Sequence, residues 1–379
     1  MCYNEIYGML RTGAACSADG NPAGRDSENG KGCCFFTMAV RKLLTCVVPC
    51  YNSAAYMERA VDSLLAGGEE MEVLIVDDGS TDGTGEIADR LAAAYPSVIK
   101  VHHQENGGHG SALNYGMAHA EGIYFKVVDS DDRMVKENLP GLMDLLRKHA
   151  DPETRADMIF HDYVYDRPEQ ENTFRITYLG KLRPDEVRTW EQSRPFHIWN
   201  QFMIHSLIYS TQFLRDLGIR MPEHTFYEDN LYIYQPLAQT RRILYHHAPL
   251  YGYFVGREDQ SINEKNILKR LDQMTNIAKQ QITSYSLEEL NRLPKHLRNY
   301  LINNACGQLF TTCALQFIED SDRSHGMNRE LWQAIRDFDP ALYRRLRRNP
   351  LGRVTCLPGR AGERFLVFIY RFGRKMIRF

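Results

Sequence analysis

The chain has 379 residues, of which 43% are hydrophobic and 25% charged, the proportions of an ordinary globular protein. A chain of this length can bury a sizeable core without disulfides or a structural metal, and its length suggests two or three domains. No run approaches the roughly 18 consecutive apolar residues that a membrane-spanning helix needs. The 46 Lys and Arg nearly balance the 48 Asp and Glu, which by itself argues against a nucleic-acid or membrane partner.

The charges are unevenly distributed along the chain. Residues 341–379 hold eleven Arg or Lys and a single acid, Glu363, so this segment carries +10 and the rest of the chain −12. Such asymmetry points to a membrane or nucleic-acid contact at one end. No recognised nucleic-acid-binding module accompanies the basic segment, so we expect no nucleic-acid partner.

The N-terminal segment differs in composition from the rest of the chain. It is rich in Gly, Ser, Asn and Asp and lacks the apolar stretch of a secretory signal, so we expect residues 1–37 to be a disordered or mis-called extension and Met38 to be the natural start. None of the nine Cys forms a Cys-x-x-Cys pair, which favours ordinary thiols in a reducing cytosol over a zinc or redox site.

From residue 43 onward, short apolar runs alternate with amphipathic stretches. The apolar runs predict buried strands over 43–48 (ended by Pro49), 72–76, 98–101 and 123–128, and a fifth strand from 158. The intervening stretches predict helices over 55–66, 84–94, from the turn at 106–111 to about 120, and over 138–149. This alternation predicts an α/β fold with a mostly parallel, Rossmann-like sheet flanked by helices.

The second half of the chain has a different pattern. Residues 170–260 are mixed, with a strand near 242–253, and residues 264–348 are helical. We therefore expect an α/β domain over 38–260, a helical region over 261–350 and a basic amphipathic tail over 351–379.

Polar clusters follow each predicted strand of the first half. They are Tyr51-Asn52, Asp77-Asp78, the turn at 106–111 and the acids of 129–132. Ligands bind outside the carboxyl ends of the strands in such sheets, so we expect the active site here.

Three acids crowd behind the fourth predicted strand. In an extended stretch Asp129 and Asp131 point the same way and could converge on one divalent cation, whereas a solvated turn with an Asp cap is the alternative. Of the other two clusters, Asp77 and Asp78 could bind a base or ribose, although capping alone explains the polar residues after them. The glycines at 106–111 could approach a phosphate but do not fit G-x-G-x-x-G, and His109 is equally consistent with a ligand, a base or a loop role.

A second acidic pair, Glu228-Asp229, stands between aromatic residues at a predicted helix start. Acids are favoured there by the helix dipole, but an apolar setting would also raise the pKa of a carboxyl group and suit it to general-base work. Arg257, Gln260 and Ser261 follow the late strand and could contact a phosphate, although an ordinary polar loop explains them as well.

Together these motifs resemble the family 2 glycosyltransferases, in particular bacterial enzymes that build capsules, exopolysaccharides or cell-wall glycans. The resemblance covers residues 42–260 and rests on the order and spacing of five motifs: Val47-Val-Pro-Cys-Tyr-Asn52, Val76-Asp-Asp-Gly-Ser-Thr-Asp82, Asn106-Gly-Gly, Val128-Asp-Ser-Asp-Asp132 and Glu228-Asp229. It implies a GT-A fold, a nucleotide-diphosphate sugar donor (a UDP-sugar), a Mn²⁺ or Mg²⁺ ion and hexosyl transfer with inversion.

The resemblance also implies roles for individual residues. Asp229 would be the general base and Glu228 would orient it or the acceptor, while Asp129 and Asp131 would hold the metal. The nucleotide and donor would contact Pro49, Tyr51, Asn52, Asp77, Asp78, Asn106, Gly107 and Asp132. Two positions depart from the family pattern: Leu113 stands where many relatives have Arg, and Lys126 stands inside a strand that is often apolar, where it could meet a phosphate or pair with an Asp.

The basic tail has the pattern of an amphipathic helix. Its apolar positions, which lie on one helical face, are 365, 368, 369, 372, 376 and 379. With the flanking Arg residues they predict a helix on an anionic membrane surface, and a helix packed on the rest of the protein is the alternative. We therefore expect a cytoplasmic enzyme at the inner face of the bacterial membrane, acting on a glycan or lipid-linked acceptor.

Two other functions share part of this pattern. A nucleotidyltransferase-like sugar-nucleotide enzyme would also bind a nucleotide beside an Asp-held metal, but it would show a Gly-rich, basic loop where this chain has 49–53. A non-catalytic membrane-surface scaffold would have no use for Asp129, Asp131 and Asp229 together.

Overall fold

The computed structural model describes residues 40–166, 174–196, 202–255 and 264–377, and residues 40–379 form one compact unit. The N-terminal extension expected over 1–37 lies outside the described residues, as do Arg257, Gln260 and Ser261.

The first half of the chain builds the parallel part of a sheet, in the order β3-β2-β1-β4. Its strands are β1 (Leu44–Cys50), β2 (Met71–Asp77), β3 (Ile99–His103) and β4 (Tyr124–Val127). The connecting helices are α1 (Met57–Leu64), α2 (Thr84–Ala94) and α3 (His109–His119). Every residue of β1, β2 and β4 is buried, which explains why continuous apolar runs encode these strands.

The sheet continues beyond β4 with mostly antiparallel pairings, in the order β8-β6-β9-β5, with β7 beside β6. These strands are β5 (Arg133–Met134), β6 (Met158–Asp166), β7 (Arg175–Ile176), β8 (Leu207–Ser210) and β9 (Ile243–Phe254), and the accompanying helices are α4 (Leu139–Lys148), α5 (Thr211–Leu217) and α6 (Asp229–Leu237). Short 3₁₀ turns lie at Leu65–Gly67, Lys136–Asn138, Trp190–Gln192 and Ile204–Ser206. The α/β prediction is confirmed, and the sheet as a whole is mixed.

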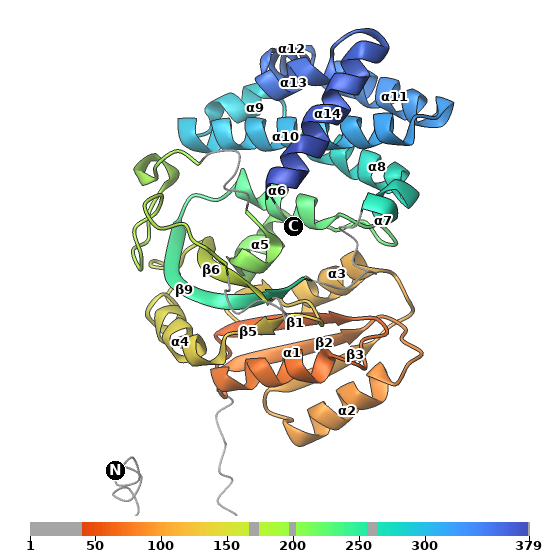
Figure 1. Cartoon of the computed structure of the whole chain (residues 1–379). Coiled ribbons are helices and arrows are strands. Elements are labelled where there is room, and N and C mark those ends of the chain that lie inside the picture. Colours follow the sequence, from red (N-terminus) through yellow and green to blue (C-terminus); the bar gives the residue numbers. More distant parts are fainter. Residues whose placement is uncertain (1–39, 167–173, 197–201, 256–263, 378–379) are drawn as a thin grey trace, which may run out of the picture. The chain divides into compact units, whose positions relative to one another are not determined.

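The helices cover both faces of the sheet. One apolar cluster packs α1, α2 and α4 against one face, and a second packs α3, α5 and α6 against the other (Figure 1). The second cluster continues into the C-terminal helices, where Phe202 stacks on Tyr300 of α10 with ring centroids 4.3 Å apart. The helical region therefore shares its core with the sheet.

The helical pattern predicted over 264–348 is confirmed and extends to residue 377. The helices are α7 (Glu264–Lys269), α8 (Leu271–Ile282), α9 (Leu287–Arg292), α10 (Lys295–Glu319), α11 (Asp322–Phe338), α12 (Pro340–Arg348), α13 (Pro350–Thr355) and α14 (Gly359–Ile377). Within the described part of the chain, no helix combines the length and apolarity needed to cross a membrane.

The first strand runs past the proline that was expected to end it. Pro49 lies within β1, opposite Val76 of β2, and the strand continues to Cys50. β4 pairs with β1 only as far as Val47, so the missing N–H of Pro49 falls where β4 has already ended.

Candidate active site

Hydrogen bonds join three of the polar clusters that follow the parallel strands. Oδ1 of Asn52 accepts a hydrogen bond from the N–H of Thr81 at 2.9 Å, and Oγ of Ser53 lies 2.8 Å from Oγ of Ser130. Asn52 adopts φ of 50°, a left-handed conformation that Asn tolerates better than most residues. Tyr51, beside it, leaves 54% of its surface exposed and available to stack on a ligand.

Asp78 fastens the glycine turn to the end of β2. Its carboxylate accepts hydrogen bonds from the backbone N–H groups of Gly107 and Gly108, each at 2.8 Å, and from Nε2 of Gln104 at 2.7 Å. The side chain of Asn106 donates to the Asp78 carbonyl at 3.0 Å. A carboxylate has about four acceptor positions, so Asp78 can accept one further hydrogen bond from a ligand.

Asp77 lies in a different environment from Asp78. Its carboxylate accepts a hydrogen bond from the N–H of Ser80 at 3.1 Å and lies 2.8 Å from Nδ1 of His103. Burial acts to raise the pKa of Asp77, but these bonds outweigh it and lower the pKa below its ordinary value. Of the two adjacent acids, only Asp78 contacts the glycine turn.

The acids after β4 form a tight turn in place of the extended stretch that was expected. The N–H of Asp132 donates to the carbonyl of Asp129 at 3.0 Å, because the strand ends at Val127 and the chain reverses at once into β5. Asp132 turns inward, where it accepts hydrogen bonds from the Tyr251 hydroxyl at 2.6 Å and the Phe254 N–H at 2.7 Å. The argument that Asp129 and Asp131 share a side by strand alternation is therefore wrong.

The pKa values of Asp129 and Asp132 are shifted in opposite directions. Burial, together with the charges of Asp129 and Asp131, raises the pKa of Asp132 well above its ordinary value. Burial acts in the same direction on Asp129, but contact with His109 outweighs it and lowers the pKa of Asp129. Asp129 therefore remains ionised, and its side chain is 32% exposed.

His109 links the acids after β4 to the second acidic pair. It is the first residue of α3, and its Nδ1 lies 2.5 Å from Oε1 of Glu228. Its Nε2 lies 3.4 Å from Oδ1 of Asp129, and among the described residues this buried nitrogen has no hydrogen-bond partner. Burial lowers the pKa of His109, but the two acids raise it well above its ordinary value, which favours the cationic form of the ring.

The second acidic pair begins α6, as the sequence pattern indicated. Glu228 occupies the N-cap position and is only 3% exposed, and Asp229 is the first helical residue. Burial, reinforced by the charges of Glu228 and Asp129, raises the pKa of Asp229 to about 7. A carboxylate with this pKa can accept a proton near neutral pH.

The loop before this pair is strained and held from several sides. His224 and Tyr227 have positive φ angles of 49° and 72°, which is unfavourable for such side chains. The Arg270 guanidinium lies 3.5 Å from the ring centroid of Phe226, and the N–H of His224 donates to the Gly107 carbonyl at 2.6 Å. Strain of this kind persists where surrounding contacts impose it, often at functional sites.

The carboxylates of Asp129 and Asp131 are the type of ligand that a divalent cation prefers. No group of three or more His, Cys, Asp or Glu side chains arranged to hold a metal occurs within the described ranges. Mg²⁺-type ions, however, are often held by one or two carboxylates together with substrate phosphates, and Asp129 is a partly exposed carboxylate with a lowered pKa, two residues before Asp131.

Both positions that depart from the family pattern are buried. Lys126 is fully buried, and its Nζ bonds Nε2 of His161 at 2.9 Å and the His205 carbonyl at 2.8 Å, so neither of these hydrogen bonds goes to an Asp. Burial lowers the pKa of Lys126 to about 7. Leu113 is buried in the core under α3.

Several contacts at the site were not anticipated from the sequence. Gln104 directly follows β3 and bonds both Asp78 and Ser111, and its position after a strand was the available signal. The Ser53–Ser130 contact spans 77 residues, and no local pattern indicates it.

Comparisons with known proteins identify the class of protein that carries this site. Residues 45–207 match the model of glycosyl transferase family 2. An uncharacterized glycosyltransferase of Mycoplasma pneumoniae is 30% identical over 230 residues, which cover 59% of this chain and 71% of that protein. The chain therefore belongs to glycosyl transferase family 2.

Other matches bear on length and fold. An uncharacterized glycosyltransferase of Rickettsia bellii is 35% identical over 152 residues, which are 40% of this chain and only 20% of the relative. The matched part therefore spans about a fifth of that relative. The structure of residues 1–349 of TarS from Staphylococcus aureus, in complex with UDP-GlcNAc, superposes with a TM-score of 0.62 at 21% identity and covers 87% of this chain and 92% of that one. This likeness confirms the predicted GT-A-type fold.

Proposed function

We propose that this enzyme transfers a sugar from a UDP-sugar to a glycan or lipid-linked acceptor in cell-surface polysaccharide synthesis, with inversion at the anomeric carbon. The observation that carries the proposal is the position of His109 between Asp129 and Glu228. The donor-side acid and the acceptor-side pair therefore lie at one place, as a single displacement requires.

Asp229 is the general base in this proposal. With a pKa of about 7 it is partly ionised at neutral pH and accepts the proton of the acceptor hydroxyl as that oxygen attacks the sugar. The neighbouring Glu228, fixed by His109, orients the acceptor or the base.

The donor binds across the ends of β1, β2 and β4 in this proposal. Pro49, Tyr51 and Asn52 line the nucleoside pocket, and the remaining acceptor position of Asp78 takes a base or ribose hydrogen. Asp77, which accepts a hydrogen bond from Ser80, supports the segment after β2 that carries Asp78. Asn106, Gly107 and Asp132 complete the donor side. A Mn²⁺ or Mg²⁺ ion held by Asp129 and Asp131, when bound, would offset the charge of the leaving diphosphate.

A lipid-linked acceptor is met at a membrane surface. We therefore place the enzyme in the cytoplasm, peripheral to the inner face of the bacterial membrane through residues 351–379, with residues 38–260 as the catalytic domain and 261–350 as its helical extension.

Donor binding and transfer test the proposal separately. Calorimetry should show UDP binding in the presence of Mn²⁺ and much weaker binding after chelation with EDTA. A screen of UDP-sugars should then find one from which the enzyme releases UDP, at a rate that rises on addition of acceptor glycans. Absence of UDP binding with Mn²⁺ present would refute the proposed donor.

A further inference from the structure

The outer face of α14 differs from the face that holds it to the protein. Leu366 is fully buried and Tyr370 is 8% exposed, and these residues pack α14 into the core shared with α10. The opposite side presents Phe365, Phe368 and Phe372, with exposed fractions of 49%, 64% and 56%. Folding has thus left uncovered three of the apolar positions that the sequence places on one face.

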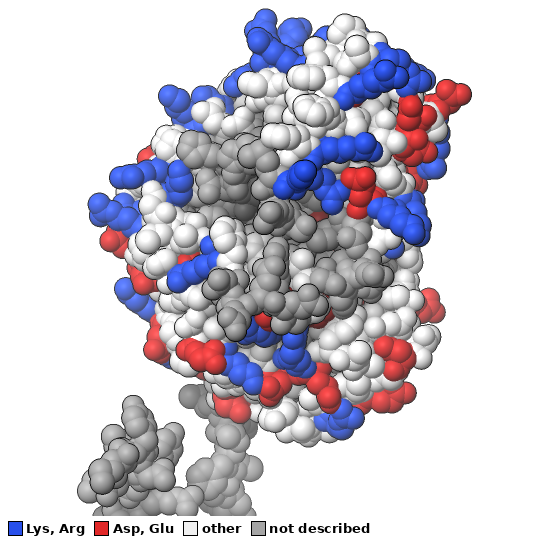
Figure 2. Space-filling view, viewed as in Figure 1, with Lys and Arg blue, Asp and Glu red and all other residues white. Residues whose placement is uncertain are grey.

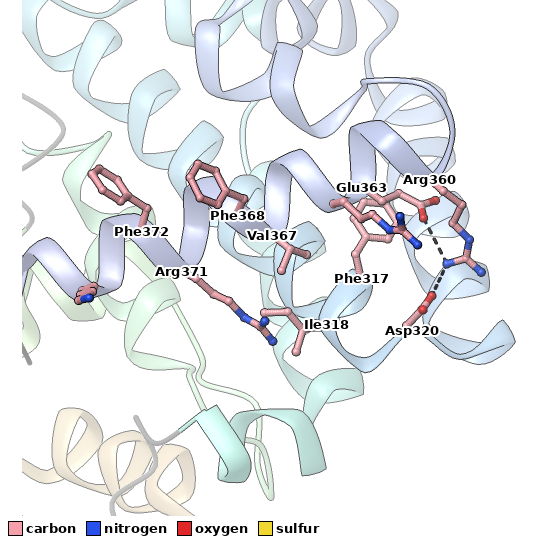
Figure 3. A pocket seen from close by; sticks show the side chains of 11 residues that line it. Phe317, Ile318, Asp320, Arg360, Glu363, Val367, Phe368, Arg371 and Phe372 are labelled. Atoms are coloured by element: carbon pink, nitrogen blue, oxygen red, sulfur yellow. Dashed lines mark hydrogen bonds and ion pairs between the residues drawn. The ribbon is translucent and has the colours of Figure 1, made fainter.

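A groove of about 870 Å³ runs along this helix (Figure 3). Phe317 and Ile318, near the end of α10, line one side, and Val367, Phe368 and Phe372 of α14 line another. Two acids, Asp320 and Glu363, also line the groove, and basic side chains complete it; they are Arg360, Arg364, Arg371 and Lys375. The groove therefore combines apolar surface with an excess of cationic groups.

The basic residues of α14 differ in how far the protein itself neutralises them. Arg360 pairs with Asp320 and Glu363, and Arg374 pairs with Glu264 at 2.7 Å. Arg364, Arg371 and Lys375, by contrast, have no ion-pair partner within the part of the chain that the structure describes; they follow one another at helical spacing beside Phe368 and Phe372. Figure 2 shows Lys and Arg side chains gathered over these C-terminal helices.

We infer that this face of α14 docks on an anionic phospholipid bilayer. Aromatic rings enter the interface between headgroups and acyl chains, and cations beside them attract the lipid phosphates. The uncompensated charges Arg364, Arg371 and Lys375 favour this partner over an apolar protein surface, which would leave them buried and unpaired. The inference rests on the membrane placement in the proposed function, and it adds the helix face, the residues and the lipid charge that would make the contact.

Contacts connect this surface to the acceptor side of the active site. Arg374 pairs with Glu264, the first residue of α7, and Arg270, between α7 and α8, stacks on Phe226 two residues before Glu228. A bilayer bound along α14 is thus linked through α7 to the loop that carries the acidic pair.

Co-sedimentation of the full chain with vesicles tests this inference. Vesicles of equal parts phosphatidylglycerol and phosphatidylcholine should bind the protein, and pure phosphatidylcholine should bind it about tenfold more weakly, because the anionic lipid supplies the charge attraction. Removing the tail would expose Leu366 and its partners, so surface substitutions are the better variants. Phe368→Ser/Phe372→Ser and Arg364→Glu/Arg371→Glu/Lys375→Glu should each reduce binding to the anionic vesicles about tenfold or more.

A second Arg-rich helix offers a matched control. Arg344, Arg345 and Arg348 of α12 are exposed, and their replacement by Glu changes the net charge as much as the α14 triple change does. This α12 variant should retain most of its binding to the anionic vesicles. Failure of the wild type to sediment, or equal loss in both triple variants, would overturn the inference.

Two other outcomes would distinguish membrane docking from dimer formation and from the proposed function. A dimer in vesicle-free solution that Phe368→Ser/Phe372→Ser dissociates would assign the face to a second copy of the chain and overturn the inference. Vesicle binding by a protein that neither binds UDP nor transfers a sugar would support the lipid surface and refute the proposed function, so the two failures are distinguishable.

Discussion

The carboxyl edge of β1, β2 and β4 and the outer face of α14 both gather charged groups, in opposite settings. At the sheet edge Asp78 and Glu228 are buried and the charges are matched: Asp78 accepts three hydrogen bonds and His109 lies between two acids. On α14, Arg364 and Lys375 lie at the surface without an acid paired to them among the described residues. Buried charge requires partners within the fold, so it builds a preformed site, whereas exposed charge remains available to an external anion.

The largest expected effect lies at the sheet edge. Asp229→Asn keeps the shape of the side chain but removes its ability to take a proton, so kcat for transfer should fall about 100- to 10,000-fold. Steady-state UDP release measures this. UDP binding should be unchanged, which separates loss of the base from misfolding, and near-normal turnover would show that another group acts as the base.

The two faces of α14 should differ in their contribution to stability. Leu366→Ala should lower the free energy of unfolding by about 2–5 kcal/mol, because it leaves a cavity in the core. Phe368→Ala, its matched partner on the exposed face, should change it by about 0.5 kcal/mol or less. Urea unfolding measures both, and equal losses would mean that Phe368 is covered in solution.

Loss of a donor-side acid should weaken nucleotide binding. Asp131→Asn should reduce the Mn²⁺-dependent affinity for UDP about 10- to 100-fold, with a matching loss of transfer at limiting donor, since one of two proposed metal ligands is weakened. Calorimetry with and without Mn²⁺ measures the change. Asp144→Asn, at an exposed carboxylate on α4, is the control and should bind UDP normally; an unchanged affinity in Asp131→Asn would contradict its role.

The smallest expected effect is on the pH profile. The pKa of Asp229 in the free protein is about 7, so kcat/KM should fall about tenfold per pH unit below that value and level off above it, because only the ionised carboxylate takes a proton. Initial rates between pH 5 and 9, at substrate concentrations well below KM, test this; a flat profile across pH 7 would exclude a base with that pKa.

Much of the fold could be predicted from the sequence, because its first half is encoded locally. Buried apolar runs mark β1, β2 and β4, and the helix predicted over 84–94 matches α2. The second half could not be predicted in this way: β8 has only four residues and was not recognised, since its pairing with β4 and β6 is made across long stretches of chain. The roles of the site residues remain predictions.

Prediction of the site was also limited by contacts between residues that are far apart in the sequence. The clusters at the strand ends were recognisable, since strands in one parallel sheet end at the same edge. Whether His109 had a role at the site could not be decided, because its contact with Glu228 spans 119 residues. The turn after β4 was mistaken for an extended stretch, because the residues that hold it, Tyr251 and Phe254, lie on β9.

The hydrogen bonds between Asp78 and the glycine turn affect the conformational entropy of that turn. A free Gly-Gly segment samples many conformations, and fixing one residue costs about 1–2 kcal/mol of backbone entropy. Here the hydrogen bonds of Asp78 to Gly107 and Gly108 restrict that freedom during folding, before any nucleotide arrives. In the proposed donor site the nucleotide would therefore meet a backbone that is already held in place, and more of its interaction energy would be retained as affinity.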